Sequence, residues 1–118
     1  MNKQKICSIN DLVENSGVCA LINNQSNHSD LDNTLEQIAL FYLPETSQKV
    51  FAIGNWDPCG HANVISRGLV CNIGDELTVA SPLYKQHFNL MTGQCIEDEA
   101  ISIPTYKVII EDDIVYLH

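Results

Sequence analysis

Short apolar runs separated by turn-forming residues are the feature that most restricts the fold of this chain. The runs are rich in β-branched and aromatic residues, and each ends at a group of Gly, Pro, Asn, Asp or Ser. No segment sustains the apolar period of a helix. The runs are 17–22, 38–43, 49–55, 68–72, 76–80, 85–90, 94–97, 105–111 and 114–118. Short strands at this spacing predict an all-β fold, either an antiparallel sandwich or a partial barrel.

Turn residues between the runs predict two hairpins. The first turns at Ile73-Gly74-Asp75 and the second at Met91-Thr92-Gly93, where the glycine supplies the left-handed backbone that such a turn requires. The polar segment 23–36 predicts a long loop. The one helical candidate, residues 8–15, would be capped by Ser8 or Asn10 and would last at most a turn or two.

Composition restricts the possible partners. The 118 residues, 45% hydrophobic, suit one domain spanning 1–118. Six basic residues against 15 acidic ones give a net charge of −9, which argues against binding to nucleic acid or an anionic membrane. The longest apolar run, 38–43, is too short to cross a bilayer, and no secretory signal is readable. We therefore expect a cytoplasmic protein with reduced cysteines, of which Cys7 and Cys19 lie among apolar residues and should be buried.

Two segments each resemble half of a metal site. The first, 55–69, contains Cys59-Gly60-His61, and the second, 81–95, has no cysteine at the corresponding place. A zinc site needs four ligands, and no second Cys/His pair has suitable spacing. A contact between Cys59 and His61 is possible on an extended loop, but nothing in the sequence supplies an orienting carboxylate or an oxyanion hole. A loop cysteine and a surface histidine are the favoured interpretation, and a metal or small-molecule site at this point stays an alternative.

The order of prolines, glycines and strands around these segments resembles the Rieske family. In that family a first Cys-Pro-His loop precedes a Gly-Leu strand. A second Cys-Pro-x-His loop precedes an aromatic residue, a leucine and a Thr-Gly turn. The residues in register here are Pro58, Arg67-Gly68-Leu69, Pro82, Phe88, Leu90 and Thr92-Gly93. The resemblance runs from about Cys7 to the C-terminus and implies a Rieske-like antiparallel β-sandwich or partial barrel.

The four cluster-ligand positions of that register are all changed. A Rieske [2Fe–2S] centre needs two thiolates on one iron and two imidazoles on the other. Asp57 and Ser81 stand at the cysteine positions, and Cys59 and Tyr84 stand at the histidine positions. Three of the four present oxygen, which suits hard cations rather than iron–sulfur chemistry. We therefore expect no metal and no cofactor on this chain.

A Rieske-like domain without ligands resembles the small subunits of assimilatory NAD(P)H-dependent nitrite reductases. The matching stretches are VFAIGNWDP, ISRGLV, VASPLYKQHFNL and GQCIEDE. This resemblance implies an accessory subunit with no catalytic residue of its own. Its implied partner is a large catalytic subunit that carries FAD, a [4Fe–4S] cluster and sirohaem and reduces nitrite to ammonium in nitrate assimilation. The alternatives are an electron-transfer ferredoxin of Rieske type and the binding module at the loop tip.

The resemblance also gives roles to residues of the two loops. Where a cluster is missing, Asp57, Ser81 and Tyr84 are expected to bridge the loops by hydrogen bonds, although they could also be solvent-exposed without partners. Trp56, Arg67 and Lys85 lie beside or flank the loops and are candidates for docking on the large subunit. For Trp56 the alternative is packing beneath the loop.

Overall fold

The computed structural model describes residues 3–23, 35–83 and 85–118. Their strands form antiparallel sheets in the orders β1–β12–β11, β10–β4–β3–β2, β5–β6 and β7–β8–β9. The elements are β1 Gln4–Ser8, the 3₁₀ turn η1 Ile9–Asp11, β2 Ser16–Asn23, β3 Leu35–Tyr42, β4 Val50–Gly54, β5 Trp56–Asp57, β6 Ala62–Asn63, the 3₁₀ turn η2 Ile65–Arg67, β7 Leu69–Ile73, β8 Glu76–Ala80, β9 His87–Asn89, β10 Thr105–Tyr106, β11 Val108–Glu111 and β12 Ile114–Leu117. The predicted all-β, antiparallel fold is confirmed.

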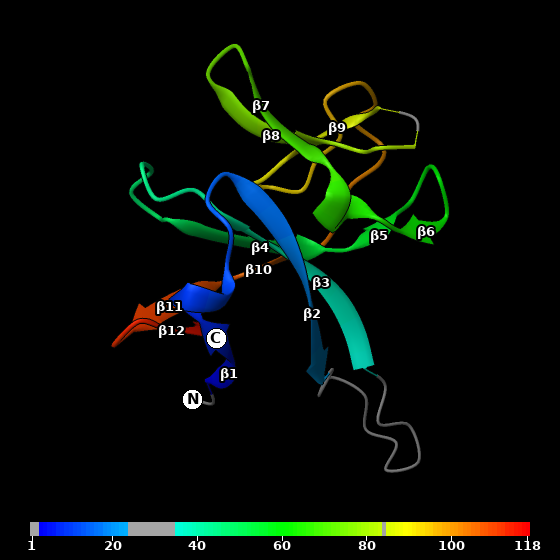
Figure 1. Ribbon diagram of the computed structural model, residues 1–118. Helices are drawn as coiled ribbons and strands as arrows, with labels where there is room; N and C mark the ends of the chain where they lie inside the picture. Colours follow the sequence, from blue (N-terminus) through cyan, green and yellow to red (C-terminus); the bar gives the residue numbers. More distant parts are fainter. Residues whose placement is uncertain (1–2, 24–34, 84) are drawn as a thin grey trace.

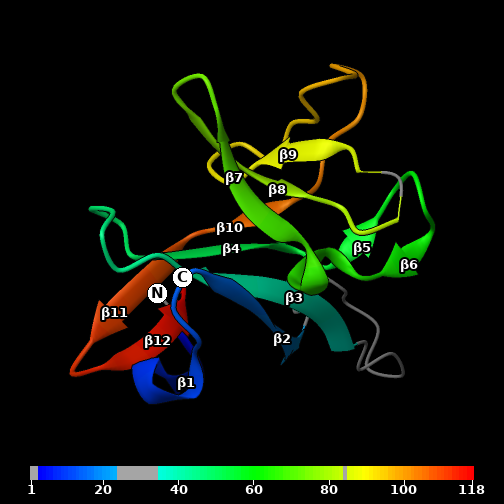
Figure 2. The same ribbon diagram turned by 45° about the horizontal axis from the view of Figure 1, so that its top comes forward.

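The central sheet β10–β4–β3–β2 is covered on both faces. Successive side chains of a strand point to opposite faces, so the apolar runs of β3 and β4 supply two cores. Figures 1 and 2 show β7, β8 and β9 on one side of this sheet and β1, β11 and β12 on the other. The first core contains Ala39, Phe41, Phe51, Ile53, Ile65, Val79, Phe88 and Leu90. The second contains Ile22, Ile38, Leu40, Val50, Ala52, Val115 and Leu117.

The first predicted hairpin is present, whereas the second pairs less than expected. β7 and β8 pair from Leu69 with Ala80 to Ile73 with Glu76. Gly93 has a φ of +79°, as its turn requires, but the 94–97 run pairs with β9 only through the bridge of Phe88 with Cys95. Two-strand pairing is brief here because the chain turns away into the 98–101 segment, where Ile101 N–H donates to the carbonyl of Asp98.

Two strand predictions need correction. The run 105–111 is divided at Lys107, since β10 pairs with β4 in the central sheet and β11 pairs with β12 in the outer one. The carbonyl of Lys107 accepts a hydrogen bond from the N–H of His118, which holds the chain where it passes between sheets. The N-terminal strand β1, which is absent from the prediction, pairs with β12. The structure describes residue 23 and residues 35 and 36 of the predicted 23–36 loop as strand, and the residues between lie outside the described ranges.

The helical candidate is a single 3₁₀ turn capped by Ser8. The Ser8 hydroxyl accepts from Asn10 N–H at 3.1 Å, and the Asp11 carboxylate accepts from Ser8 N–H at 3.0 Å. In the described part of the chain, no helix has the length and apolar character that a membrane span requires.

The prediction for Cys19 was wrong, and that for Cys7 was only partly right. Cys7 is half-buried against the second core. Cys19 pairs in register with the buried Ala39, but it lies on the edge strand β2, where the face of the sheet is incompletely covered, and it is exposed. Its thiol donates to the side-chain oxygen of Gln37 at 3.4 Å. Apolar neighbours in sequence do not reveal whether a strand lies at an edge.

Candidate functional site

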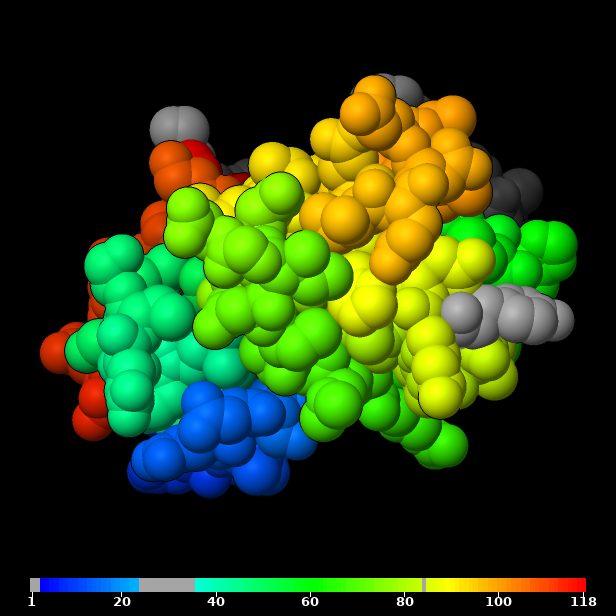
Figure 3. Space-filling view, turned by 90° about the horizontal axis from the view of Figure 1, so that it is seen from above, coloured from blue at the N-terminus to red at the C-terminus, as the bar shows by residue number. Residues whose placement is uncertain are grey.

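The two loops singled out by the sequence lie side by side at one end of the molecule. The first is the β5–β6 hairpin, and the second joins β8 to β9 (Figures 1 and 2). In Figure 3 the green first loop and the yellow-green second loop meet at the same end of the surface. They touch through Gly60, where an added Cβ would lie 2.4 Å from Cδ1 of Leu83. We call residues 56–63, 81–83, 85 and 86 the loop tip.

Asp57 and Ser81, at the two former cysteine positions, connect the loops. Both residues are buried, with exposed fractions of 0% and 1%. The Ser81 hydroxyl donates a hydrogen bond to Oδ2 of Asp57. The expected bridge is therefore present for this pair, and its carboxylate acceptor makes the bond a charge-assisted one. Tyr84, the third residue of that prediction, lies outside the described residues.

The same two residues also hold the backbone of their own loops. The N–H of Cys59 donates to Oδ1 of Asp57 at 2.8 Å, and the N–H of Leu83 donates to the Ser81 hydroxyl at 3.3 Å. Each side chain thus accepts from the residue two positions later, which is the bond of an Asx or Ser/Thr turn. Asp57 and Ser81 are equivalent positions in two similar loops.

The backbone of each loop closes in the same way. His61 N–H donates to the carbonyl of Asp57 at 2.7 Å, and Lys85 N–H donates to the carbonyl of Ser81 at 3.0 Å. His61 has a φ of 56° and Lys85 a φ of 63°. The fifth residue counted from Asp57, and likewise from Ser81, therefore has the left-handed conformation. That conformation costs about 1 kcal/mol for a residue other than glycine, and the surrounding bonds must compensate for it.

Asn55 anchors the first loop to the body of the fold. It is almost fully buried, and its side-chain oxygen accepts from Ser66 N–H at 2.7 Å. Its side-chain nitrogen donates to the side chain of Gln37 at 3.0 Å, and its backbone also bonds with Gln37 and with Ile65. Sequence reasoning missed this residue. The available signal was a polar side chain directly after an apolar strand and before the loop.

The structure does not support a reactive pair of Cys59 and His61. Burial raises the pKa of the half-buried Cys59 thiol, and the Asp57 carboxylate raises it further. A thiol with a raised pKa is protonated at neutral pH and is a weak nucleophile and metal ligand. The His61 ring lies parallel to the Trp56 indole, with centroids 6.1 Å apart and an interplanar angle of 8°. Trp56 remains 49% exposed, so it is not packed beneath the loop.

The donor atoms of the loop tip do not fit a Rieske cluster. The two thiolate positions are occupied by a carboxylate and a hydroxyl that bond to each other. The first imidazole position is occupied by the Cys59 thiol. In the ranges that the structure describes, no three His, Cys, Asp or Glu side chains are grouped as a metal site requires.

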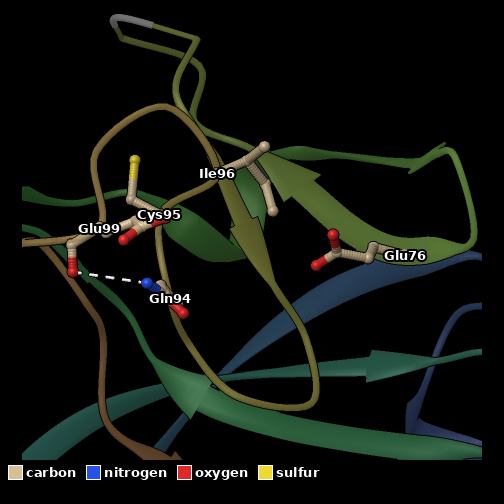
Figure 4. Close-up of a pocket in the computed structure, with 5 residues that line it drawn as sticks. All are labelled: Glu76, Gln94, Cys95, Ile96 and Glu99. Atoms are coloured by element: carbon tan, nitrogen blue, oxygen red, sulfur yellow. Dashed lines mark hydrogen bonds between the residues drawn. The ribbon is translucent and has the colours of Figure 1, made fainter.

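A pocket of about 140 Å³ has none of these ligand positions in its lining (Figure 4). Gln94 donates to the backbone carbonyl of Glu99 across it, at 3.5 Å. The nearby Cys95 thiol is buried, burial raises its pKa, and it donates to the Glu97 carboxylate at 3.7 Å. The protonated Cys95 thiol is a weak nucleophile and a weak metal ligand, so this pocket does not have the features of a reactive or metal-binding site. The lining residues are Glu76, Gln94, Cys95, Ile96 and Glu99.

The three docking candidates are all exposed but belong to different elements. Trp56 begins the first loop, and Lys85 ends the second. Arg67 ends η2, between β6 and β7. The structure therefore brings Trp56 and Lys85 to the loop tip itself, whereas Arg67 lies on the connection that follows.

Comparisons with known proteins agree with this geometry. The model of the Rieske-like [2Fe-2S] domain family matches residues 2–118. The nitrite reductase (NADH) small subunit of Salmonella typhimurium is 44% identical over 114 residues, which are 97% of this chain and 94% of that protein. The NMR structure of the Escherichia coli protein NirD has a TM-score of 0.79 at 40% identity, and the match covers 98% of this chain and 94% of that one.

A longer relative contains a similar segment. The nitrite reductase [NAD(P)H] large subunit of Klebsiella oxytoca is 31% identical over 114 residues, which are 97% of this chain but 10% of that protein. The relatives that match along most of their own length are small subunits. The chain therefore belongs to the Rieske-like [2Fe-2S] domain family, and within it to the family of nitrite reductase (NADH) small subunits.

Proposed function

We propose that this chain is the accessory small subunit of a cytoplasmic NAD(P)H-dependent nitrite reductase that acts in nitrate assimilation. The observation that carries the proposal is the identity of 44% to a nitrite reductase small subunit along nearly the whole of both chains. Such identity over a full domain is typical of proteins with the same role, although fold alone would not imply it. The chain would support the reduction of nitrite to ammonium by the large subunit.

Association with the large subunit is supported by the Klebsiella oxytoca relative. There, a segment similar to 97% of this chain is part of the large-subunit polypeptide. A domain that is covalently joined to a catalytic chain in one protein is expected to contact that chain where the two are separate. Trp56, Arg67 and Lys85 are the docking candidates of this proposal.

The small subunit of this proposal has no catalytic residue and no cofactor. The buried Asp57–Ser81 pair and the protonated Cys59 thiol replace the donors that a cluster needs. FAD, the [4Fe–4S] cluster and sirohaem would all belong to the large subunit. A Rieske-type ferredoxin is the alternative with the same fold, and the donor set disfavours it.

Coexpression with the large subunit of the source organism tests the proposal. Nitrite-dependent oxidation of NADH is expected to be several-fold faster when this chain is present, and the purified chain is expected to be colourless and free of iron. Equal activity with and without the chain would overturn the accessory role. Stoichiometric iron with an EPR signal on reduction would favour the ferredoxin.

A further inference from the structure

The surface of the loop tip differs from the rest of this acidic chain. Asp57 is the only Asp or Glu among residues 56–63 and 81–86, and it is fully buried. The described residues of the tip therefore contribute no exposed carboxylate of their own, although Glu36 lines a pocket with Trp56 and Pro58, and Glu97 pairs with His87 directly after the tip. Its exposed side chains include large apolar ones: Trp56 is 49% exposed and Leu83 is 45% exposed. Lys85 adds a positive charge beside them.

This apolar surface is held in a defined shape. The Ser81–Asp57 hydrogen bond connects the two loops, and the contact of Leu83 with Gly60 seats the second loop on the first. The Trp56 ring is held against His61. Binding to a surface that is already ordered avoids much of the entropy cost of association, so these side chains suit an anchor in a protein interface.

The chain ends lie away from the tip. Gln4 pairs with Leu117, so the two ends of the described chain are adjacent on the β1–β12–β11 sheet. Figures 1 and 2 both place this sheet at the opposite end of the molecule from β5 and β6. A covalent connection to a larger chain, as in the Klebsiella oxytoca large subunit, would leave the tip free.

We propose that the loop tip, formed by Trp56, His61, Pro82, Leu83 and Lys85, is the surface that docks on the large subunit. The inference rests on the proposed function and adds the chemistry of the partner. The complementary surface on the large subunit is an apolar depression with an acidic edge that meets Lys85. The ends of the small subunit lie away from this contact. A separate small subunit and a domain joined to the large subunit could therefore dock through the same surface.

Charge substitutions at the tip, each paired with a matched substitution elsewhere, test this surface. Leu83→Asp is compared with Val13→Asp, because Val13 is also an exposed apolar residue, 58% exposed, but follows η1 near the N-terminus. Lys85→Glu is compared with Lys49→Glu, because both lysines are exposed and both have positive φ. The affinity of each purified variant for the purified large subunit with its cofactors is measured by titration calorimetry, and thermal unfolding checks that each variant folds.

We expect Leu83→Asp to weaken binding by roughly tenfold or more, and Lys85→Glu to weaken it in a salt-dependent way. Val13→Asp and Lys49→Glu should bind within about twofold of the unmodified chain. If the tip variants fold and bind as tightly as their controls, the docking surface is elsewhere and only this inference fails. If the unmodified chain does not bind the large subunit at all, the proposed function fails with it.

Discussion

Replacing Ser81 with alanine tests the bridge on which the shape of the loop tip depends. The substitution removes the hydrogen bond to Oδ2 of Asp57 and the weaker one accepted from Leu83 N–H at 3.3 Å. It leaves Oδ2 of a fully buried carboxylate without this donor, whereas the exposed Leu83 N–H is closer to solvent. The expected cost is therefore set mainly by Asp57.

The magnitude follows from the charge and burial of the acceptor. A hydrogen bond to a charged group contributes about 1.5 to 3 kcal/mol, and a buried acceptor that loses its donor costs about 1 to 3 kcal/mol. The two values describe overlapping parts of one loss, so we expect Ser81→Ala to lower the free energy of unfolding by about 2 to 3 kcal/mol. For a domain of this length that corresponds to a fall in Tm of roughly 6 to 15 °C.

Urea and thermal unfolding followed by circular dichroism measure this change. Ser47→Ala, at an exposed turn position, is the matched control and should change the free energy of unfolding by less than about 0.5 kcal/mol. A double-mutant cycle with Asp57→Asn should give a coupling energy of about 1 kcal/mol or more. A Ser81→Ala variant as stable as the control, or a coupling energy near zero, would show that the bridge does not stabilise the tip.

Three further substitutions test the turn at Gly93 and the ion pair of His87 with Glu97. Gly93→Ala should lower the free energy of unfolding by more than about 3 kcal/mol, because the new Cβ would lie 1.9 Å from the Ile103 carbonyl oxygen. Gly74→Ala is the control: it is also at positive φ but has open space around it, so urea unfolding should show a loss of only about 1 kcal/mol. Partial burial raises the pKa of Glu97, but hydrogen bonds from the His87 backbone and ring outweigh it and leave the pKa below its ordinary value of 4.5. The Glu97 carboxylate therefore contributes its full stabilisation above pH 4.5 and loses it as the pH falls through the lowered pKa. Glu97→Gln should make the free energy of unfolding fall less steeply between about pH 5 and pH 3. An equally steep fall in the variant would contradict this.

Apolar runs bounded by turn residues were sufficient to predict the long strands. β2, β3 and the β7–β8 hairpin contain the predicted runs, because each pairs with a strand that is close in sequence. The passage at Lys107 was not predictable, since both sides of it are apolar and strand-like in sequence. Which sheet a strand joins depends on distant partners, and a single sequence does not contain that information in its local pattern.

The loop residues were identified by register, but their geometry was not. The register of Pro58, Pro82 and Gly68 led to the prediction that Asp57 and Ser81 bridge the loops by a hydrogen bond, and this bond is present. The role of Asn55 depends on its contacts with β3 and η2, which are distant in sequence, so no local motif marks it. The stacking of Trp56 on His61 likewise requires the hairpin turn before it can be seen.

Both loops are ordered by oxygen acceptors of this chain's own side chains. Each loop needs an acceptor for the N–H two residues later and a left-handed residue at its fifth position. Asp57 and Ser81 supply the acceptors through oxygen, and their mutual hydrogen bond joins the loops. These hydrogen bonds order the tip, while its outer side chains Trp56 and Leu83 remain exposed. The proposed protein contact rests on these side chains: the exposed Trp56 and Leu83, with the charge of Lys85 beside them.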